Sequence, residues 1–223
     1  MPDPEPRIVA SGRDSDIYEH GPDRVLRRAR DGRSLESEAA TMRHVFDCGY
    51  PVPRVWEANG PDLVMDRIDG PTMLDTLGKQ PWTFRRHAAI LADLHEGLHR
   101  VPPPGDLPEV GGGDALLHLD LHPMNVIMSP TGPVVIDWPN ARRGPAELDV
   151  AMTWVIVGCS IVPGSAPRRA AAGLLRRRFV DAFLSHFDRA AVEAFLPDVI
   201  DRRVRDRNVL PAEVEAMHRL VHE

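Results

Sequence analysis

Cysteines and long apolar segments are scarce in this chain of 223 residues. The two cysteines, Cys48 and Cys159, stand far apart and form no C-x-x-C pair. This spacing gives no sign of a disulfide framework or a cysteine zinc site, and it suits a reducing compartment. The longest apolar run, residues 150–162, is too short to span a bilayer. The first residues also lack the basic and apolar regions of a signal peptide. We therefore expect a cytoplasmic protein with no membrane partner.

Lysine is almost absent, because Lys79 is the sole lysine in the chain. Any site that needs a cation must therefore use arginine unless Lys79 serves it. The formal net charge is -6 and the pI is about 5.9, whereas nucleic-acid-binding domains are usually basic. The composition therefore excludes nucleic acid as an expected partner. Hydrophobic residues make up 43% and charged residues 27%, which is ordinary for a globular protein.

Short apolar stretches separated by turn residues dominate the first part of the chain. They predict a small antiparallel sheet, with strands at residues 7–10, 16–19, 25–28, 55–57 and 63–66. Apolar residues at helical spacing after Ser34 predict a helix between the third and fourth strands. Glu38 falls on the inward face of this helix, which is a costly place for a carboxylate unless it is paired.

Beyond Asp69-Gly70-Pro71 the pattern becomes mostly helical. Helices are expected at residues 84–98, 145–157, 167–186, 190–195 and 211–222. Short strands are expected at residues 115–119, 126–128 and 134–137. We therefore predict an α+β fold with two lobes. A β-rich lobe would occupy residues 1–69, and a mostly helical lobe would occupy residues 70–223.

The chemistry of the chain concentrates in one loop and in the hairpin that follows it. The loop reads His-Leu-Asp-Leu-His-Pro-Met-Asn, and the second hairpin strand ends in Val-Val-Ile-Asp. The hairpin turn sets Asn125 roughly opposite residues 136–137, so antiparallel pairing brings Asn125 and Asp137 side by side. Both side chains offer oxygen to a hard cation such as Mg²⁺, which prefers few protein ligands plus phosphate oxygens. Asp120 lies near enough to accept a hydroxyl proton, and these parts together suit phosphoryl transfer.

This stretch resembles the aminoglycoside phosphotransferase family, a group of small-molecule kinases with a protein-kinase-like fold. The resemblance rests on Asp-Leu-His-Pro-Met-Asn and Ile-Asp-Trp, a variant of the kinase H-x-D-x-x-x-x-N loop and its metal-binding aspartate. It implies that Asp120 is the catalytic base or the carboxylate that orients the acceptor. It also implies that Asn125 and Asp137 bind Mg²⁺. The residues that would support the loop are His118, His122 and Asp149.

The resemblance also implies a nucleotide site in the first lobe. Glu38 takes the place of the helix glutamate that pairs with a strand lysine, and Arg27 replaces that lysine. An arginine is able to hold a carboxylate and phosphates bidentately. Backbone groups from Asp66 to Ile68 would face the adenine. The phosphates would meet a short polar turn that contains Ser11, Gly12 and Ser15. We therefore expect ATP, with GTP left open, together with Mg²⁺ and a small-molecule hydroxyl as acceptor, in a monomer or homodimer.

Three other interpretations stay open. An arginine at position 27 and a glycine-poor phosphate turn favour a nucleotide-binding pseudokinase that acts as a regulatory module. The short chain favours a compact, RIO-like atypical protein kinase. Finally, His118, Asp120 and His122 alternate as on a strand and could bind Zn²⁺ in a metallohydrolase, although Pro123 breaks such a strand.

A cationic acceptor would need carboxylates in the cleft. Candidates in the helical lobe are Glu147, Asp181, Asp188 and Glu193. A cluster of arginines near the end of the chain is interpreted as a solvated helix face or loop rather than as an anion site. It comprises Arg202, Arg203, Arg205 and Arg207.

Overall fold

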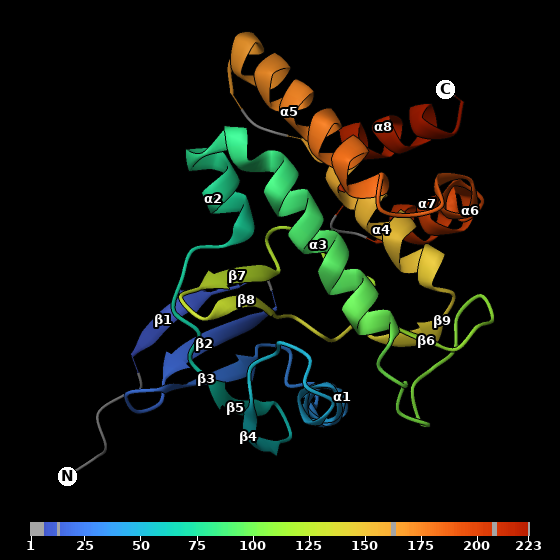
Figure 1. Cartoon of the computed structure of the whole chain (residues 1–223). Helices are drawn as coiled ribbons and strands as arrows, with labels where there is room; N and C mark the ends of the chain where they lie inside the picture. Colours follow the sequence, from blue (N-terminus) through green and yellow to red (C-terminus); the bar gives the residue numbers. More distant parts are fainter. Residues whose placement is uncertain (1–6, 13, 162–163, 207–208, 223) are drawn as a thin grey trace.

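The structure is a computed structural model that describes residues 7–12, 14–161, 164–206 and 209–222. Its first part is a five-stranded antiparallel sheet in the order β1-β2-β3-β5-β4 (Figure 1). The strands are β1 (Ile8–Ser11), β2 (Ser15–Glu19), β3 (Arg24–Ala29), β4 (Val55–Asn59) and β5 (Asp62–Asp66). All five strands expected in this part are present, with small shifts at their ends.

The central strand β3 turns an arginine toward the interior. Side chains alternate along a strand, so Arg27 shares a face with Val25 and Ala29, and all three are buried. The register sets Arg27 opposite Ile17 of β2 and Leu63 of β5. The cationic side chain of Arg27 therefore lies in the middle of the covered face of the sheet.

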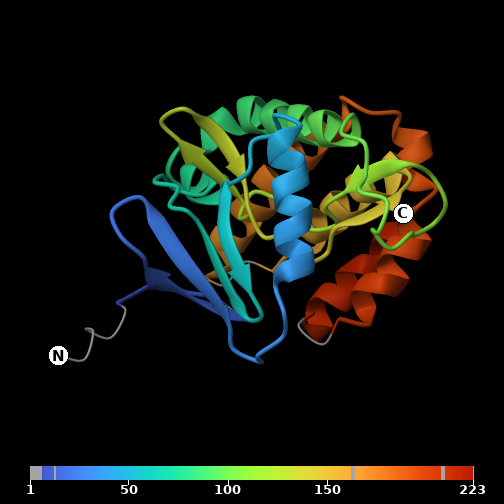
Figure 2. The same ribbon diagram turned by 90° about the horizontal axis from the view of Figure 1, so that it is seen from below.

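Helix α1 (Glu36–Asp47) lies between the sheet and the helical part of the molecule (Figure 2) and packs against β4. The hydroxyl of Ser34 accepts a hydrogen bond from the amide of Glu36 at 3.2 Å. The helix ends before Gly49, whose φ of 80° is in the left-handed region that favours glycine. Glu38 faces inward, as its spacing predicts.

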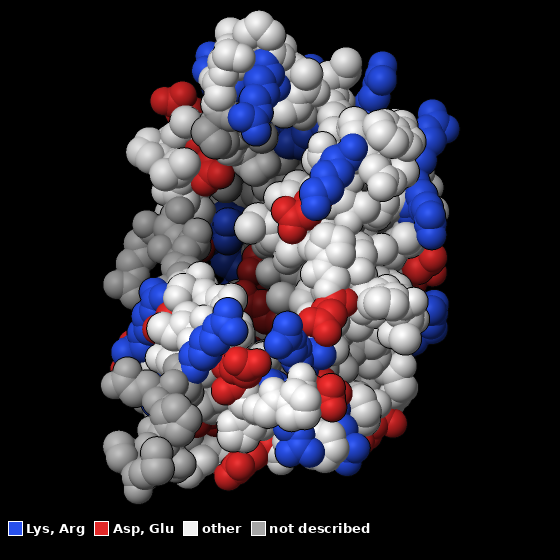
Figure 3. Space-filling view, turned by 90° about the vertical axis from the view of Figure 1, so that its left-hand side faces the viewer, with Lys and Arg blue, Asp and Glu red and all other residues white. Residues whose placement is uncertain are grey.

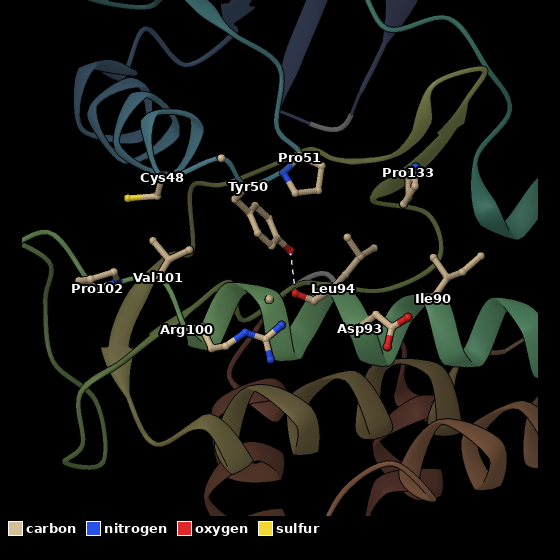
Figure 4. Close-up of a pocket in the computed structure, with 12 residues that line it drawn as sticks. Cys48, Tyr50, Pro51, Ile90, Asp93, Leu94, Arg100, Val101, Pro102 and Pro133 are labelled. Carbon is tan, nitrogen blue, oxygen red and sulfur yellow. Dashed lines mark hydrogen bonds between the residues drawn. The ribbon is translucent and has the colours of Figure 1, made fainter.

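The loop after α1 is anchored to α3 (Phe84–His99) and to a hairpin of the second part. The Tyr50 hydroxyl donates a hydrogen bond to the carbonyl oxygen of Leu94 at 3.0 Å (Figure 4). The amide of Val135 donates to the carbonyl oxygen of Pro51 at 2.8 Å. A groove of about 660 Å³ opens beside these contacts. The two contacts tie the helix that carries Glu38 to the second part of the chain.

Helix α2 (Met73–Lys79) and the 3-10 turn η1 (Pro81–Thr83) precede α3 and were not expected. A capping box starts α2: the Thr72 hydroxyl accepts from the amide of Asp75 at 3.0 Å, and the Asp75 carboxylate accepts from the amide of Thr72 at 3.2 Å. The Thr-x-x-Asp pattern is a readable start signal. However, seven residues are too few to establish helical periodicity.

The remaining helices pack on α3 and on one another (Figure 1). They are α4 (Ala146–Cys159), α5 (Ala166–Leu184), α6 (Arg189–Glu193), α7 (Leu196–Val204) and α8 (Pro211–His222). Helix α4 is apolar on most sides because α5, α6, α7 and α8 all cover it. Helix α7 was not assigned from the sequence. No helix in the described ranges is both long enough and apolar enough to cross a membrane.

Two small sheets join these helices to the rest of the molecule. Strand β6 (Ala115–Leu117) pairs with β9 (Arg142–Gly144), and β7 (Val126–Ser129) pairs with β8 (Gly132–Val135). The strand expected at residues 134–137 ends at Val135, because Asp137 has a φ of 70° that no regular strand admits. For the same reason the strand expected at residues 115–119 ends before Leu119, whose φ is 60°.

Candidate active site

A cleft of about 580 Å³ lies between the five-stranded sheet and the β7–β8 hairpin. Seen from the left of Figure 1, the molecule is hollowed at mid-height, with side chains of both charge signs inside the hollow (Figure 3). Seven of the site residues expected from the sequence line the cleft. They are Gly12, Ser15, Arg27, Asp66, Ile68, Asn125 and Asp137.

The apolar walls of this cleft were not predicted from the sequence. The sheet contributes Ile17, Val25 and Met65, and the hairpin side contributes Ile127 and Ile136. The alternation of side chains along β3 could have identified Val25, since it shares a face with Arg27. Two apolar walls with polar groups at one end suit a flat ring that carries a charged tail.

A buried carboxylate supports the loop from His118 to Asn125, here called the 118–125 loop. Leu119 adopts a φ of 60°, which is costly for a residue with a side chain. Asp149 accepts hydrogen bonds from the amides of Leu119 at 2.6 Å and His118 at 3.2 Å. Burial favours a higher pKa for Asp149, but the hydrogen bond from His99 and the nearby histidines outweigh it and lower the pKa to about 2. These contacts are those of a residue that supports the loop.

His118 is fully buried and connects the loop to the hairpin. Its Nδ1 accepts from the amide of Asp120 at 3.2 Å, and its Nε2 lies 3.2 Å from the carbonyl oxygen of Ile136. A carbonyl only accepts, so Nε2 carries the proton of a neutral ring. Burial lowers the pKa of His118, which agrees with a neutral ring. The ring also packs on Trp138, so its contacts are those of a supporting residue.

The Asp120 carboxylate is held by two neighbours from its own loop. Asn125 Nδ2 donates to the Asp120 carbonyl oxygen at 2.9 Å and to Oδ2 at 3.2 Å. His122 Nε2 lies 3.4 Å from Oδ1, and His122 Nδ1 accepts from the amide of Met124 at 3.3 Å. Burial favours a higher pKa for Asp120, but the hydrogen bond from His122 outweighs it and lowers the pKa. Asp120 is therefore an ionised carboxylate in a fixed position.

Asn125 and Asp137 offer two oxygen donors to the cleft. Asn125 Nδ2 is engaged with Asp120, which leaves the amide oxygen Oδ1 to a ligand. The Asn125 carbonyl accepts from the amide of Ile136 at 3.0 Å, so the hairpin register is the expected one. The Asp137 side chain is 42% exposed. One amide oxygen and one carboxylate fit a Mg²⁺ ion whose other ligands are phosphate oxygens and water.

Arg27 lies among three side chains from different segments. Its Nη1 donates to Glu38 Oε1 at 2.6 Å, which confirms the expected contact. Its Nε donates to Ser15 Oγ at 3.2 Å, and its Nη2 donates to Asp137 Oδ1 at 3.2 Å. Glu38 Oε1 also accepts from the amide of Trp138 at 3.1 Å. Burial raises the pKa of Glu38 against the opposing effect of Arg27.

The polar turn between β1 and β2 is closed by its own contacts. The amide of Gly12 donates to the Ser15 carbonyl at 2.9 Å. The Ser11 hydroxyl donates to Asp16 Oδ1 at 2.8 Å, and Arg30 also binds this carboxylate. The hydrogen bonds from Arg30 and Ser11 lower the pKa of Asp16 to about 2. The Ser11 hydroxyl is therefore already hydrogen-bonded to Asp16, while Gly12 and Ser15 line the cleft.

Asp66 and Ile68 lie where β5 leaves the sheet, and both line the cleft. The Asp66 carboxylate accepts from Trp56 Nε1 at 2.7 Å and from the amide of Arg54 at 3.3 Å. The Asp66 side chain is therefore hydrogen-bonded to residues next to β5 rather than directed at a ligand. In the described part of the chain the amide of Ile68 has no backbone acceptor, so this segment offers a backbone donor to a ligand.

The zinc alternative is wrong. The described ranges contain no group of three or more histidine, cysteine, aspartate or glutamate side chains arranged to hold a metal ion. Both ring nitrogens of His118 are already engaged, with the Asp120 amide and the Ile136 carbonyl. His118, Asp120 and His122 therefore do not form a three-ligand metal site.

The sequence matches the model of the phosphotransferase enzyme family over residues 5–115 and 106–195. Curated protein sequences give no match. The gentamicin–APH(2")-IIa complex is structurally similar, with a TM-score of 0.62 and 15% identity over 96% of this chain and 91% of that chain. Spectinomycin phosphotransferase APH(9)-Ia, solved with ADP and spectinomycin, has a TM-score of 0.58 and 12% identity, with coverage of 96% and 85%.

Choline kinase LicA from Streptococcus pneumoniae is also similar, with a TM-score of 0.56 and 15% identity over 94% of this chain and 88% of that chain. At these identities the likeness establishes the fold. It confirms the expected α+β, bilobal, protein-kinase-like architecture.

Proposed function

Because this chain belongs to the phosphotransferase enzyme family, we propose that it moves the γ-phosphoryl group of MgATP to a hydroxyl of a small molecule. One observation carries this proposal: Asn125 and Asp137 line the same cleft as Arg27, and Asn125 holds Asp120 beside it. Phosphoryl transfer needs a metal clamp, a cation for the phosphates and a placed carboxylate for the acceptor. These four side chains supply all three.

The nucleotide fits the cleft by its shape and donors. The adenine would lie between the apolar walls, against the backbone of Asp66 and Ile68. Arg27 has a donor group directed at Asp137 and would share it with the phosphates. Magnesium between Asn125 and Asp137 would neutralise phosphate charge. We also propose a cytoplasmic setting, since this is where ATP is abundant and where the free thiols Cys48 and Cys159 stay reduced.

In the reaction the acceptor oxygen attacks the γ-phosphorus while the bond to the β,γ-bridging oxygen breaks. The hydroxyl proton leaves to Asp120 or to solvent as the new ester forms. Asp120 has a lowered pKa, so it is a weak base and its main contribution is to orient the hydroxyl. This agrees with a loose transition state in which positioning matters more than proton removal.

The test replaces Asp120 with alanine. Asp120→Ala should lower kcat for nucleotide-dependent phosphorylation by about 10²–10⁴-fold, while calorimetry should give an unchanged Kd for MgADP. Asp114→Ala is the matched control, because the Asp114 side chain is 91% exposed and its ion pair is with Arg143 at 3.5 Å. This variant should retain full activity. An Asp120→Ala enzyme with wild-type turnover would contradict the proposed role.

A second candidate is a nucleotide-binding pseudokinase, and one observation favours it. Arg27 is hydrogen-bonded to both Glu38 and Asp137, so it occupies one oxygen of a proposed metal ligand. A slow nucleotide hydrolysis by the purified protein that disappears in Asp137→Ala would exclude this candidate. MgADP binding in the absence of any turnover would favour it.

A further inference from the structure

A second, smaller cavity of about 230 Å³ lies against the 118–125 loop. The residues that line it come from the 118–125 loop, from β9 and the turn before it, from α4, and from α7 and the residues just after it. They are Leu119, Asn140, Arg142, Met152, Arg202, Arg203 and Asp206. Leu119 directly precedes Asp120, and the charge of Arg203 is among those that lower the pKa of Asp120. The cavity therefore meets the 118–125 loop one residue before the proposed acceptor-orienting carboxylate, and it shares no lining residue with the nucleotide cleft.

Positive charge prevails in this cavity. Three arginines line it against one carboxylate, Asp206. Arg203 Nη1 binds Asp206 at 3.2 Å. Arg142 Nη1 donates to the carbonyl oxygen of Ala141 at 2.7 Å, and Arg202 is exposed. One carboxylate cannot balance three guanidinium groups, so the cavity attracts an anion.

Arg203 also retains unused hydrogen-bonding capacity. Its Nε is enclosed and has no acceptor among the described residues. Its side chain is 24% exposed, so the guanidinium is largely withdrawn from water. Buried donors are normally paired in proteins. Among the described residues Arg203 is hydrogen-bonded through Nη1 alone, so its guanidinium retains donors for a second anion.

The carboxylates that a cationic acceptor would need lie elsewhere. Asp181 and Glu193 pair with Arg189. Asp188 caps α6 through the amides of Ala190 and Ala191. Glu147 is in the first turn of α4 and does not line the cavity. The four candidates from the sequence therefore give this cavity no negative charge.

We propose that this cavity is the acceptor subsite and that it takes a small hydroxylated carboxylate. The proposal rests on the proposed phosphotransferase function and names its substrate class. The carboxylate would bind the guanidinium groups of Arg142 and Arg203, with the hydroxyl directed toward Asp120. The interpretation of the arginine cluster as a solvated face agrees with the exposure of Arg202, whereas Arg203 is partly withdrawn from solvent. It is right for Arg205, which pairs with Asp201 in the open, while Arg207 lies outside the described residues.

The first experiment compares acceptors of equal length. Linear ω-hydroxy carboxylates, ω-amino alcohols and diols of three to six carbons are tested for nucleotide-dependent phosphorylation. The best carboxylate should exceed the amino alcohol of the same length at least tenfold in kcat/KM, with the diol between them. Amino alcohols that match or exceed the carboxylates would overturn the proposal.

The second experiment uses variants with the best carboxylate. Arg203→Gln and Arg142→Gln should raise KM for the carboxylate at least tenfold more than they raise KM for the diol of the same length. Arg203→Lys keeps the charge and should recover part of the loss. Arg205→Gln, at the C-cap of the same helix, is the matched control and should behave as the wild type. Equal KM values in Arg203→Gln and Arg205→Gln would overturn the subsite.

Different results would contradict the phosphotransferase function and the carboxylate subsite. A wild-type protein that neither binds MgADP by calorimetry nor phosphorylates any acceptor contradicts the phosphotransferase function. Phosphorylation that prefers amines contradicts the carboxylate subsite alone. Binding of 4-hydroxybutanoate, followed as a shift in melting temperature, needs no turnover. It should be weaker in Arg203→Gln than in Arg205→Gln, and an equal shift in both would count against the subsite.

Discussion

Arg27 is the residue on which the first lobe and the hairpin converge. It contacts Glu38 from α1, Asp137 from the end of the hairpin and Ser15 from β2. The second carboxylate oxygen of Glu38 is enclosed and has no partner among the described residues. Glu38 is therefore held in a buried position mainly by Arg27, and its raised pKa reflects the cost of that burial.

Replacing Arg27 alone should lower the free energy of unfolding more than replacing both Arg27 and Glu38. Arg27→Met leaves the Glu38 carboxylate buried alone and should lower the free energy of unfolding by about 3 kcal/mol. The double variant Arg27→Met/Glu38→Met should recover most of that loss, because no unpaired charge remains. Urea unfolding measures both.

Arg28→Met is the control for this pair. Arg28 is the next residue on β3 and binds Asp62 at 2.6 Å, but its side chain is 48% exposed. Its loss should cost at most about 1 kcal/mol. A double variant that is no more stable than Arg27→Met would show that Arg27 does not stabilise Glu38 in the way proposed.

At the scale of elements, the segment between β5 and α2 is packed tightly against the hairpin. Gly70 has a φ of 151°, and a Cβ at this position would lie 2.4 Å from the carbonyl oxygen of Met128 in β7. The amide of Met128 donates to the carbonyl of Pro71 at 2.8 Å. Glycine is thus required here, because both the backbone shape and the space exclude a side chain. Gly70 also lines the nucleotide cleft.

Gly70→Ala should therefore move this segment away from β7. The strain should lower the free energy of unfolding by about 2 kcal/mol. The shift of the cleft wall should weaken MgADP binding about tenfold, equivalent to roughly 1.4 kcal/mol. Calorimetry and urea unfolding measure these effects.

Gly78→Ala is the matched control on the neighbouring helix. Gly78 lies in α2, and a Cβ there would meet nothing within 4 Å. This change should stabilise the protein by up to about 1 kcal/mol, because alanine favours the helix more than glycine does. MgADP binding should not change. A Gly70→Ala protein that behaves like Gly78→Ala would contradict the tight packing at this point.

At the scale of the whole molecule, a group of buried polar side chains joins the helices to the 118–125 loop. His95 from α3 is fully buried, and its Nε2 lies 3.0 Å from the hydroxyl of Thr153 in α4. The Thr153 hydroxyl donates to the Leu121 carbonyl at 2.7 Å. Burial lowers the pKa of His95 to about 4, against the attraction of Asp149.

This depressed pKa makes global stability depend on pH. Because the unfolded histidine titrates near 6.5 and the folded one near 4, the unfolded state binds the extra proton between these values. The contribution of His95 is complete above pH 6.5 and is lost as the pH falls to 4. At about 1.36 kcal/mol per pKa unit, the loss should be roughly 3 kcal/mol.

A comparison of the wild type with His95→Gln measures the pH-dependent contribution of His95 to the free energy of unfolding. The free energy of unfolding of the wild type should fall more steeply between pH 6.5 and 4 than that of His95→Gln, since glutamine does not titrate. His186→Gln is the control, because His186 is exposed; it should keep the steeper wild-type slope. Identical slopes in the wild type and His95→Gln would show that His95 is not kept neutral by burial.

The amino-acid sequence alone determined the parts of this protein that depend on local patterns. Alternating and helical spacing located the five strands of the first sheet and the helix that carries Glu38. The hairpin turn determined the pairing of Asn125 with the end of β8, because antiparallel register follows directly from turn position. The 118–125 loop and the residues after β8 are separated only by one hairpin, so their kinase-like order was readable without a fold.

The tertiary structure alone decided what depends on distant contacts. The left-handed backbone at Leu119 and Asp137 ended two expected strands, and Asp149 stabilises the first of these from another element. Arg142 and Arg203 reach one cavity because α7 packs on α4 and β9 pairs with β6. Neither local propensity nor periodicity contains that information, since burial and charge pairing arise when separate elements pack together. The sequence therefore identified the 118–125 loop, and packing decided which charges lie beside it.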